Sequence, residues 1–265
     1  MDKIIGLGNA LIDVLATLKD DTLLDELELP KGSMQLIDDA KLQQINTKFS
    51  QMKTHLATGG SAGNAILGLA CLGAGTGFIG KVGNDHYGDF FRKNLQKNNI
   101  EDNLLTSEQL PSGVASTFIS QDGERTFGTY LGAAASLKAE DLTLEMFKGY
   151  AYLFIEGYLV QDHEMILHAI ELAKEAGLQI CLDMASYNIV ENDLEFFSLL
   201  INKYVDIVFA NEEEAKAFTG EEPEEALRVI AKKCSIAIVK VGANGSYIRK
   251  GTEEIKVSAI PVEKV

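Results

Sequence analysis

Short apolar runs alternate with longer amphipathic stretches through most of the chain. The runs cover residues 4–7, 152–155, 179–182, 207–210 and 236–241, and Gly, Asn, Asp or Glu follows each of them. Runs of this length that end at turn residues predict β-strands. Strands that alternate with helices predict parallel βαβ units, so the expected fold class is α/β with a doubly wound, mostly parallel sheet.

The clearest helix prediction covers residues 161–176. Apolar residues recur between Ile166 and Ala173 at the spacing i, i+3, i+4, i+7, which places them on one face of a helix. Gly177 follows, as is common directly after a helix. The pattern therefore predicts an amphipathic helix that ends before Gly177.

Two stretches break this alternation. Residues 114–120 and 125–131 are rich in β-forming residues and flank an Asp-Gly turn, which predicts an antiparallel hairpin. Residues 15–38 contain Pro30, Gly32 and many acids, and fit poorly into a βαβ unit.

We expect these two stretches to form a small β lid. It would consist of roughly residues 13–38 and 112–131, inserted in a single α/β domain that spans residues 1–265. No internal repeat or Pro/Gly/Ser linker divides the chain, so a lid is favoured over a second independent domain.

Composition narrows the possible partners. The chain has 265 residues and 46% hydrophobic residues, enough for one large core. Its net charge of −15, from 39 acidic and 24 basic residues, repels nucleic acids and anionic membrane surfaces. An anionic ligand must therefore be held locally, by backbone N–H groups, a few cations or a divalent metal.

The cysteines and the N-terminal pattern favour the cytoplasm. Cys71, Cys181 and Cys234 lie far apart without CxxC spacing, which argues against disulfides and a zinc site. The chain starts without a signal-peptide pattern. Residues 56–80 lack charge, but they hold many glycines and polar residues, so they predict a glycine loop, a buried helix and a strand rather than a membrane span.

Polar residues at the strand ends are the first candidates for a site, because ligands of open parallel sheets bind beyond the carboxyl ends of the strands. These residues are Asn9, Asp13, Glu156, Asp183, Asn211, Gly242 and Gly245. Turn formation explains any one of them equally well. Glu156 and Asp183 favour a function, because a carboxylate beside an apolar strand usually has a reason to be there.

A glycine-rich segment, from Thr58 through Gly59, Gly60 and Ser61 to Asn64, precedes a helix predicted at residues 65–72. This placement leaves N–H groups free at a helix start and allows the backbone to approach a ligand. A tight turn or helix packing explains the glycines equally well. Asn64 would either cap the helix or hydrogen-bond hydroxyl groups.

Asn211 and Glu214 also admit two interpretations. Asn followed three residues later by Glu satisfies the capping-box pattern. A Glu and an Asn near a triphosphate would also hold the water shell of Mg²⁺. Both roles are compatible.

Several familiar motifs are absent or incomplete. No GxxxxGK[ST] occurs, which excludes a P-loop. Residues 6–11 have Leu11 in place of the third glycine of GxGxxG, which disfavours a dinucleotide oxidoreductase. His163 and His168 are five residues apart and point in different directions on a helix, so they predict surface residues rather than a zinc site.

Taken together, the motifs resemble the ribokinase-like (PfkB) family of carbohydrate and nucleoside kinases. The matching segments are GLGNALIDV at 6–14, GGSAGN at 59–64, GKVGNDHYGD at 80–89, ERTFGTYLGAA at 124–134, N-x-x-E at 211–214 and VKVGANGS at 239–246. GSMQLID at 32–38 and ERTFGTYLGAA are most similar to the adenosine-kinase-like branch.

The resemblance implies an ATP- and Mg²⁺-dependent kinase that transfers the γ-phosphoryl group to a primary hydroxyl of a sugar or nucleoside, with an adenosine-like or ribose-like acceptor. The implied substrate-binding residues are Asp13, Gly60, Ser61, Asn64 and Glu156. The implied nucleotide-binding residues are Asn211, Lys240, Gly242 and Gly245, with Glu214 at the metal through water and Arg125 as a candidate at the transferring phosphoryl group. Lys240 stands where many relatives have Thr.

The family's catalytic base is the Asp of a GAGD motif, which does not occur in this sequence. Residues 258–265 resemble the strand before that motif, so the base is expected beyond Val265, with the C-terminal part of the fold missing and the 265-residue chain inactive by itself. The alternative is a relative that binds a nucleoside or sugar without catalysis. The resemblance also implies a possible homodimer through the lid.

Overall fold

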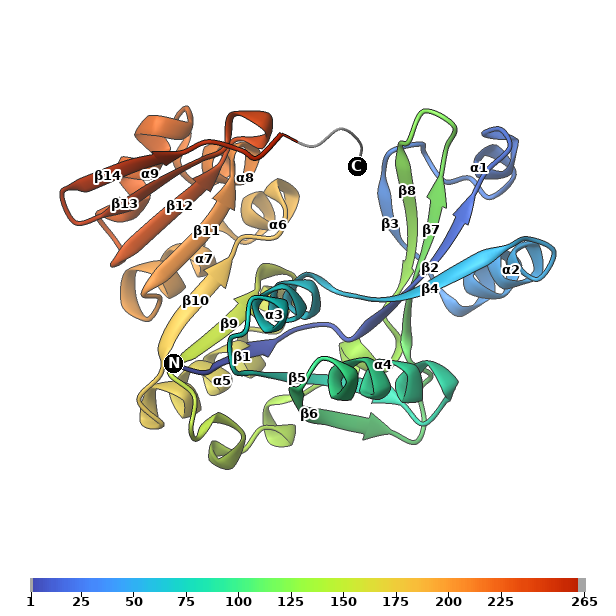
Figure 1. Ribbon diagram of the computed structural model, residues 1–265, viewed down its shortest axis with the longest axis horizontal. Helices are drawn as coiled ribbons and strands as arrows, with labels where there is room; N and C mark the ends of the chain where they lie inside the picture. The colour runs from blue at the N-terminus through green and yellow to red at the C-terminus, as the bar shows by residue number, and fades with distance from the viewer. Residues whose placement is uncertain (1, 262–265) are drawn as a thin grey trace. The chain divides into compact units, whose positions relative to one another are not determined.

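The computed structural model describes residues 2–261 and has a mixed α/β fold, drawn in Figure 1. The chain divides into two compact units. One unit consists of Met1–Leu7 and Lys138–Val265, and we call it the discontinuous unit. The other, Gly8–Leu137, is called the continuous unit.

The discontinuous unit contains a sheet of the strand order β14-β13-β12-β11-β10-β9-β1. Its strands are β1 (Ile4–Leu7), β9 (Tyr152–Glu156), β10 (Gln179–Asp183), β11 (Ile207–Asn211), β12 (Ile236–Lys240), β13 (Ser246–Lys250) and β14 (Glu253–Val257). Neighbours from β1 to β12 are parallel, whereas β13 and β14, at the red end of Figure 1, are antiparallel.

All of the strands predicted for this sheet are confirmed. The strands β9, β10 and β11 extend one residue further than predicted and thus include Glu156, Asp183 and Asn211. Apolar side chains within the runs, such as Leu153, Ile180 and Val208, are fully buried. The apolar runs therefore located the strands because both faces of a parallel sheet are covered.

Helices and short helical turns connect these strands. They are η2 (Ala139–Asp141), η3 (Leu144–Phe147), η4 (Gly157–Gln161), α5 (His163–Glu175), α6 (Tyr187–Asn192), α7 (Leu194–Lys203), α8 (Glu212–Thr219), α9 (Pro223–Ala231) and η5 (Gly242–Asn244). The predicted helix at 161–176 is confirmed as α5. It begins at His163 because the Asp162 side chain accepts a hydrogen bond from the Met165 amide at 3.1 Å and caps the helix.

The continuous unit contains a five-stranded sheet of the order β3-β8-β7-β2-β4 and a parallel pair of strands, β5 and β6. The strands are β2 (Leu11–Thr17), β3 (Met34–Leu36), β4 (Thr54–Gly59), β5 (Thr76–Gly83), β6 (Ile100–Ser107), β7 (Gly113–Ile119) and β8 (Arg125–Tyr130). The helices are α1 (Thr22–Glu26), α2 (Asp39–Phe49), α3 (Ser61–Cys71), α4 (His86–Lys97) and η1 (Gly132–Ser136).

The predicted hairpin is confirmed, because β7 and β8 pair antiparallel from Ile119 and Arg125 onward. Gly123 in its turn has φ +88°, which favours glycine. Both segments predicted for the lid contribute strands to the five-stranded sheet. The lid and the single-domain organisation stay predictions.

Residues 56–80 do not begin with the predicted glycine loop. Strand β4 runs through Thr58 and Gly59, and α3 begins directly afterwards at Ser61. The helix is also less buried than predicted, since only Ala62 and Ile66 in it are buried.

Among the helices of residues 2–261, none combines the length and apolar character that a membrane crossing requires.

The C-terminal strand expected at 258–265 is not present in the described part of that segment. Residues 258–261 follow β14 without strand structure. Residues 262–265 lie outside the described residues, as does the base expected beyond Val265.

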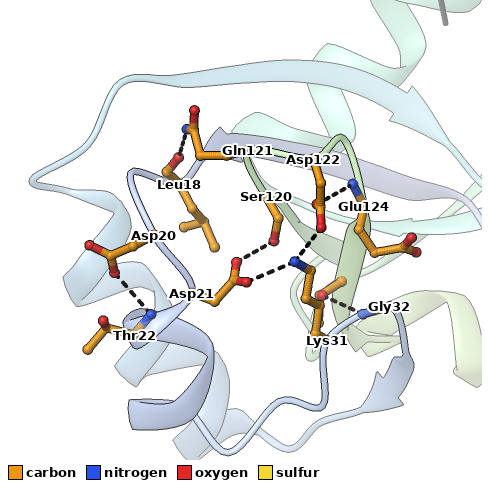
Figure 2. Close-up of polar contacts among 11 residues, drawn as sticks. Leu18, Asp20, Asp21, Thr22, Lys31, Gly32, Ser120, Gln121, Asp122 and Glu124 are labelled. Carbon is orange, nitrogen blue, oxygen red and sulfur yellow. Dashed lines mark hydrogen bonds and ion pairs between the residues drawn. The ribbon is translucent and has the colours of Figure 1, made fainter.

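A polar network joins the irregular segment after β2 to the turn of the hairpin, as Figure 2 shows. The Lys31 ammonium group donates to Asp21 at 2.8 Å and to Asp122 at 2.6 Å, and Ser120 donates to the other oxygen of Asp21 at 2.6 Å. Hydrogen bonds with Asp122 and Asp21 raise the pKa of Lys31. The network adds polar contacts to the burial of Leu24, Leu27 and Leu29 in the same segment.

Asp85 holds a second polar cluster, at the start of α4. One oxygen of its carboxylate accepts from the amides of Tyr87 and Gly88 at 3.1 and 2.8 Å and from the Ser112 hydroxyl at 2.7 Å. The other oxygen accepts from the Ser112 amide at 2.8 Å. Burial raises the pKa of Asp85, but the hydrogen bonds from Ser112 and Gly88 outweigh burial, and the pKa lies below its usual value.

Gly83 and Gly88, in the motif at 80–89, lie so close to neighbouring backbone atoms that a side chain would not fit. A Cβ atom on Gly88 would lie 2.3 Å from the Gly83 carbonyl oxygen, and one on Gly83 would lie 2.5 Å from the Ser112 amide nitrogen. The motif at 80–89 therefore has a structural explanation: it joins β5, α4 and the chain before β7.

Replacing Asp85 tests this explanation. We expect Asp85→Ala to lower the free energy of unfolding by about 2–3 kcal/mol, because a helix cap and both bonds from Ser112 are lost. Asp85→Asn keeps one acceptor oxygen and should cost about half as much. Urea unfolding followed by circular dichroism measures both, and a change in Asp85→Ala below about 0.5 kcal/mol would contradict the assignment.

Candidate functional site

The predicted site residues fall into two groups, one in each unit. The continuous unit holds Asp13, Gly60, Ser61, Asn64 and Arg125. The discontinuous unit holds Glu156, Asp183, Asn211, Glu214, Lys240, Gly242 and Gly245.

Asp13 lies on β2 beside the end of β4. In the register of these strands Leu11 is opposite Gly59, and Asp13 is opposite Ala57. A Cβ atom on Gly59 would lie 2.3 Å from a carboxylate oxygen of Asp13. Gly59 therefore makes room for this carboxylate, a role that the sequence analysis did not assign.

Gly60 is the N-cap residue of α3. Its φ of +85° favours glycine, and a Cβ atom there would lie 2.2 Å from the Asn9 carbonyl oxygen. Ser61 is the first residue of the helix, and the Asn64 amide donates to the Gly60 carbonyl at 2.9 Å. Asn64 thus lies in the first turn, so the interpretation of Asn64 as the cap is wrong.

No side chain caps α3, and the side chain of Asn64 is exposed. The structure thus brings the Asp13 carboxylate close to Gly59, the last residue of β4, and α3 begins two residues later at Ser61. The ligand-binding roles of these residues stay predictions.

Asp13 has an unusual titration. Burial raises the pKa of this carboxyl to about 6, and the positive charge of Arg125 partly opposes that effect. The carboxyl group is therefore largely ionised above pH 7 and is then a strong acceptor for hydroxyl hydrogens. Arg125 lies at the start of β8 and is exposed. Its predicted contact with a phosphoryl group stays a prediction.

The second group lies at the carboxyl ends of four neighbouring parallel strands, β9 to β12. Asp183 is opposite Glu156 in the pairing of β10 and β9, and Lys240 is opposite Asn211 in the pairing of β12 and β11. Glu156 is completely buried. The strand ends that the sequence singled out are therefore brought to one edge of the sheet.

Asn211 and Glu214 form the predicted capping box at the start of α8. The Glu214 amide donates to the Asn211 side chain at 2.8 Å, while the Asn211 amide and side chain donate to the two Glu214 carboxylate oxygens at 2.7 and 2.8 Å. Burial raises the pKa of Glu214, the Asn211 amide lowers it, and the nearby charge of Asp183 raises it further. The structural interpretation of N-x-x-E is confirmed.

Lys240 is ion-paired rather than free. Its ammonium group lies 3.2 Å from Asp183, whose carboxylate reaches it across the end of β11.

Tyr158 is a further residue of this group. Burial and the charges of Glu156, Glu214 and Asp183 raise its pKa. The sequence analysis missed Tyr158, because nothing in the local pattern marks a tyrosine beside three acids.

This group offers few side chains that could coordinate a metal ion directly. Within residues 2–261, no three His, Cys, Asp or Glu side chains are arranged to hold a metal ion. Mg²⁺ needs fewer protein ligands because it keeps several waters. Glu214 is only 3% exposed and accepts two hydrogen bonds from Asn211, one on each carboxylate oxygen, so only its remaining lone pairs are available to a metal-bound water. Its role at the metal through water stays a prediction.

The two glycines after β12, Gly242 and Gly245, differ in why glycine occupies the position. A Cβ atom on Gly245 would lie 1.9 Å from the Val257 carbonyl oxygen, so β14 requires this glycine. Gly242 has φ +54° and open space where its Cβ atom would be. Of the two, Gly242 fits the predicted close approach of a nucleotide, while Gly245 has a structural explanation.

Comparisons with known proteins agree with these motifs. A family model described as "pfkB family carbohydrate kinase" matches residues 32–265. The chain belongs to this family. The solved adenosine kinase of Sinorhizobium meliloti is 31% identical, with a TM-score of 0.87, and the match covers 100% of this chain and 82% of that one.

A probable sugar kinase from Rhizobium etli CFN 42 has a TM-score of 0.89 and 31% identity, over 100% of this chain and 81% of that one. The guanosine-inosine kinase of Escherichia coli (strain K12) is 25% identical over an alignment of 264 residues, which covers 95% of this chain and 61% of that protein. The chain thus spans 61% of that curated relative's length. The family resemblance and the ribokinase-like α/β fold are confirmed.

The glycine beside Asp13 gives a test within one unit. Gly59→Ala should lower stability by about 1–3 kcal/mol and displace the Asp13 carboxylate, because the added methyl group overlaps it. Gly68→Ala, in α3 of the same unit, is the matched control. Nothing lies within 4 Å of the position of its Cβ atom, so the added methyl group should stabilise the helix by about 0.5–1 kcal/mol. Equal effects in the two variants, measured by urea unfolding, would contradict the close approach.

The raised pKa of Asp13 predicts a pH dependence. Its folded pKa of about 6 lies above the ordinary value of 3.8, so the folded state holds a proton between these values that the unfolded state has lost. The contribution of Asp13 to stability is therefore present below that window and is lost as the pH rises through about 6. Asp13→Asn cannot ionise, so its stability relative to the unsubstituted protein should rise between about pH 4 and about pH 6.5, the window set by the two pKa values. A constant difference between the two proteins in urea unfolding at these pH values would exclude the raised pKa.

Proposed function

We propose that this protein is an ATP-dependent kinase that transfers the γ-phosphoryl group to a primary hydroxyl of a nucleoside or sugar. Membership of the pfkB family and 31% identity to an adenosine kinase support the reaction class. The structural observation that carries the proposal is the partly buried Asp13 carboxylate, fitted against Gly59 at the start of α3.

Asp13 would accept hydrogen bonds from acceptor hydroxyls. A carboxylate accepts from neighbouring hydroxyl groups, and its ionised form makes the stronger bonds. Asn64 has an exposed amide in the first turn of α3, and Gly60 and Ser61 begin that helix, so all three suit contacts with a polar ring. An adenosine-like or ribose-like acceptor fits this chemistry. Glu156 is proposed as a further substrate contact from β9.

The nucleotide would be held by the other group. Lys240 supplies positive charge, Gly242 leaves space for close approach, and Asn211 lies at the start of α8. Gly245 keeps the turn after β12 in shape. Mg²⁺, bound through water near Glu214, would neutralise phosphate charge. In a chain with a net charge of −15, these local cations would be essential for binding ATP.

The base is expected to be the Asp of a GAGD motif beyond Val265. Arg125 is a candidate for the transferring phosphoryl group, because it lies close enough to affect the pKa of Asp13. A dimer formed through the lid and a cytoplasmic location complete the proposal.

An ADP-release assay on the protein of the full reading frame tests the function, with ATP, Mg²⁺ and a panel of nucleosides and sugars. We expect turnover with at least one of them and a loss of about 10- to 100-fold in kcat/KM for Asp13→Asn, because an ionised acceptor is removed. Asp89→Asn, which changes an exposed carboxylate on α4, is the control and should keep full activity.

The outcomes separate the candidate functions. Binding of a nucleoside or sugar by calorimetry without ADP release would favour a non-catalytic binding protein. Turnover that is unchanged in Asp13→Asn would overturn the proposed role of Asp13 and leave the reaction class standing.

A further inference from the structure

The ion pair between Lys240 and Asp183 brings a cation to an acidic edge of the sheet. Glu156, Asp183 and Glu214 act together on the pKa of Tyr158, so their charges lie in one neighbourhood. The positive charge of Lys240 acts in the opposite sense there and lowers the pKa of Glu214. Lys240 thus compensates part of the negative charge at the strand ends.

The Asp183 carboxylate has two separate partners. One oxygen accepts from the Lys240 ammonium group at 3.2 Å, and the other accepts from the Ala185 amide at 3.0 Å. Ala185 has a φ of +65°, a conformation that costs a residue with a side chain, and the Ser186 amide donates to the Met184 carbonyl around it at 2.8 Å. Asp183 is therefore fixed to the backbone independently of Lys240.

The two partners of the ion pair differ in exposure and in their other contacts. The Asp183 side chain is 13% exposed and fixed by the turn, whereas the Lys240 side chain is 49% exposed and has a long, flexible stem. A partly exposed ion pair of this kind contributes little stability, about 0–1 kcal/mol, so breaking it is easy. Lys240 can therefore change partner while Asp183 remains in place.

We propose that Lys240 is an exchangeable counter-ion: it pairs with Asp183 in the ligand-free protein and moves to a polyphosphate that binds beside Gly242. Asp183 then acts as an internal competitor that weakens anion binding at Lys240. The inference rests on the proposed function only for its choice of a polyphosphate as the anion. It concerns binding and needs no turnover.

Competition of this kind has a consequence that a metal-binding or purely structural role of Asp183 does not share. Removing a carboxylate that competes for Lys240 should strengthen anion binding, and only while Lys240 is present. Removing a carboxylate that holds a metal or the fold should weaken binding. The two roles therefore predict changes of opposite sign.

The experiment is a calorimetric titration of inorganic tripolyphosphate into the protein in EDTA, without acceptor. We expect about threefold to tenfold tighter binding in Asp183→Asn, because the competing charge is lost while the acceptor for the Ala185 amide is kept. Lys240→Met should bind about tenfold more weakly than the unsubstituted protein. The double variant should bind like Lys240→Met, and Lys240→Arg, which keeps the charge, should bind like the unsubstituted protein.

Glu213→Gln is the matched control, because Glu213 is an exposed acid on α8 near the same group. Glu213→Gln should bind tripolyphosphate slightly more tightly because repulsion is reduced. This small gain in affinity should be the same in the unsubstituted protein and in the Lys240→Met variant. Weaker binding in Asp183→Asn would overturn the proposal, and so would a gain of the double variant over Lys240→Met that exceeds the small gain from Glu213→Gln. Circular dichroism checks that each variant is folded, and failure of ADP release in the kinase assay would leave this result unaffected.

Discussion

The parallel register of β9 to β12 is the constraint on which the group of polar residues at the ends of these strands depends. Because neighbouring strands run in the same direction, each apolar run delivers the polar residue at its end to one edge of the sheet. Glu156, Asp183 and Asn211 therefore lie at the same edge of the sheet, although many residues separate them in the chain. The same geometry creates a problem, since it gathers carboxylates where the proposed function requires an anion to bind.

The acidic edge is stabilised by two different kinds of contact. Asn211 donates hydrogen bonds to both oxygens of Glu214, and Asp183 accepts a hydrogen bond from the Ala185 amide and forms an ion pair with Lys240. Hydrogen bonds and an ion pair thus replace the water that these carboxylates lose. Only the Lys240 contact is substantially exposed, so the charge compensation at this edge can change there without disturbing the backbone.

Much of the fold was predictable because local pattern and tertiary environment agree. Buried strands such as β10 are apolar runs, α5 has an apolar face, and an Asp-Gly turn joins β7 to β8. Strand β4 was missed because it is an edge strand with an exposed middle, so its sequence shows neither an apolar run nor an alternation. Asn64 was open to interpretation as a cap because a glycine N-cap has no side chain to signal its position.

Some roles could not be predicted from the sequence because they depend on an atom that is distant along the chain. Gly59 matters because it faces Asp13, and the Asp183 partner of Lys240 lies 57 positions earlier. Neither relation has a local pattern. Lys240 gives no sequence signal of its partner, yet at this edge it adds a positive charge beside an acid. That addition changes the expected behaviour of the site, because the affinity for an anion then depends on how strongly Asp183 competes for the same ammonium group.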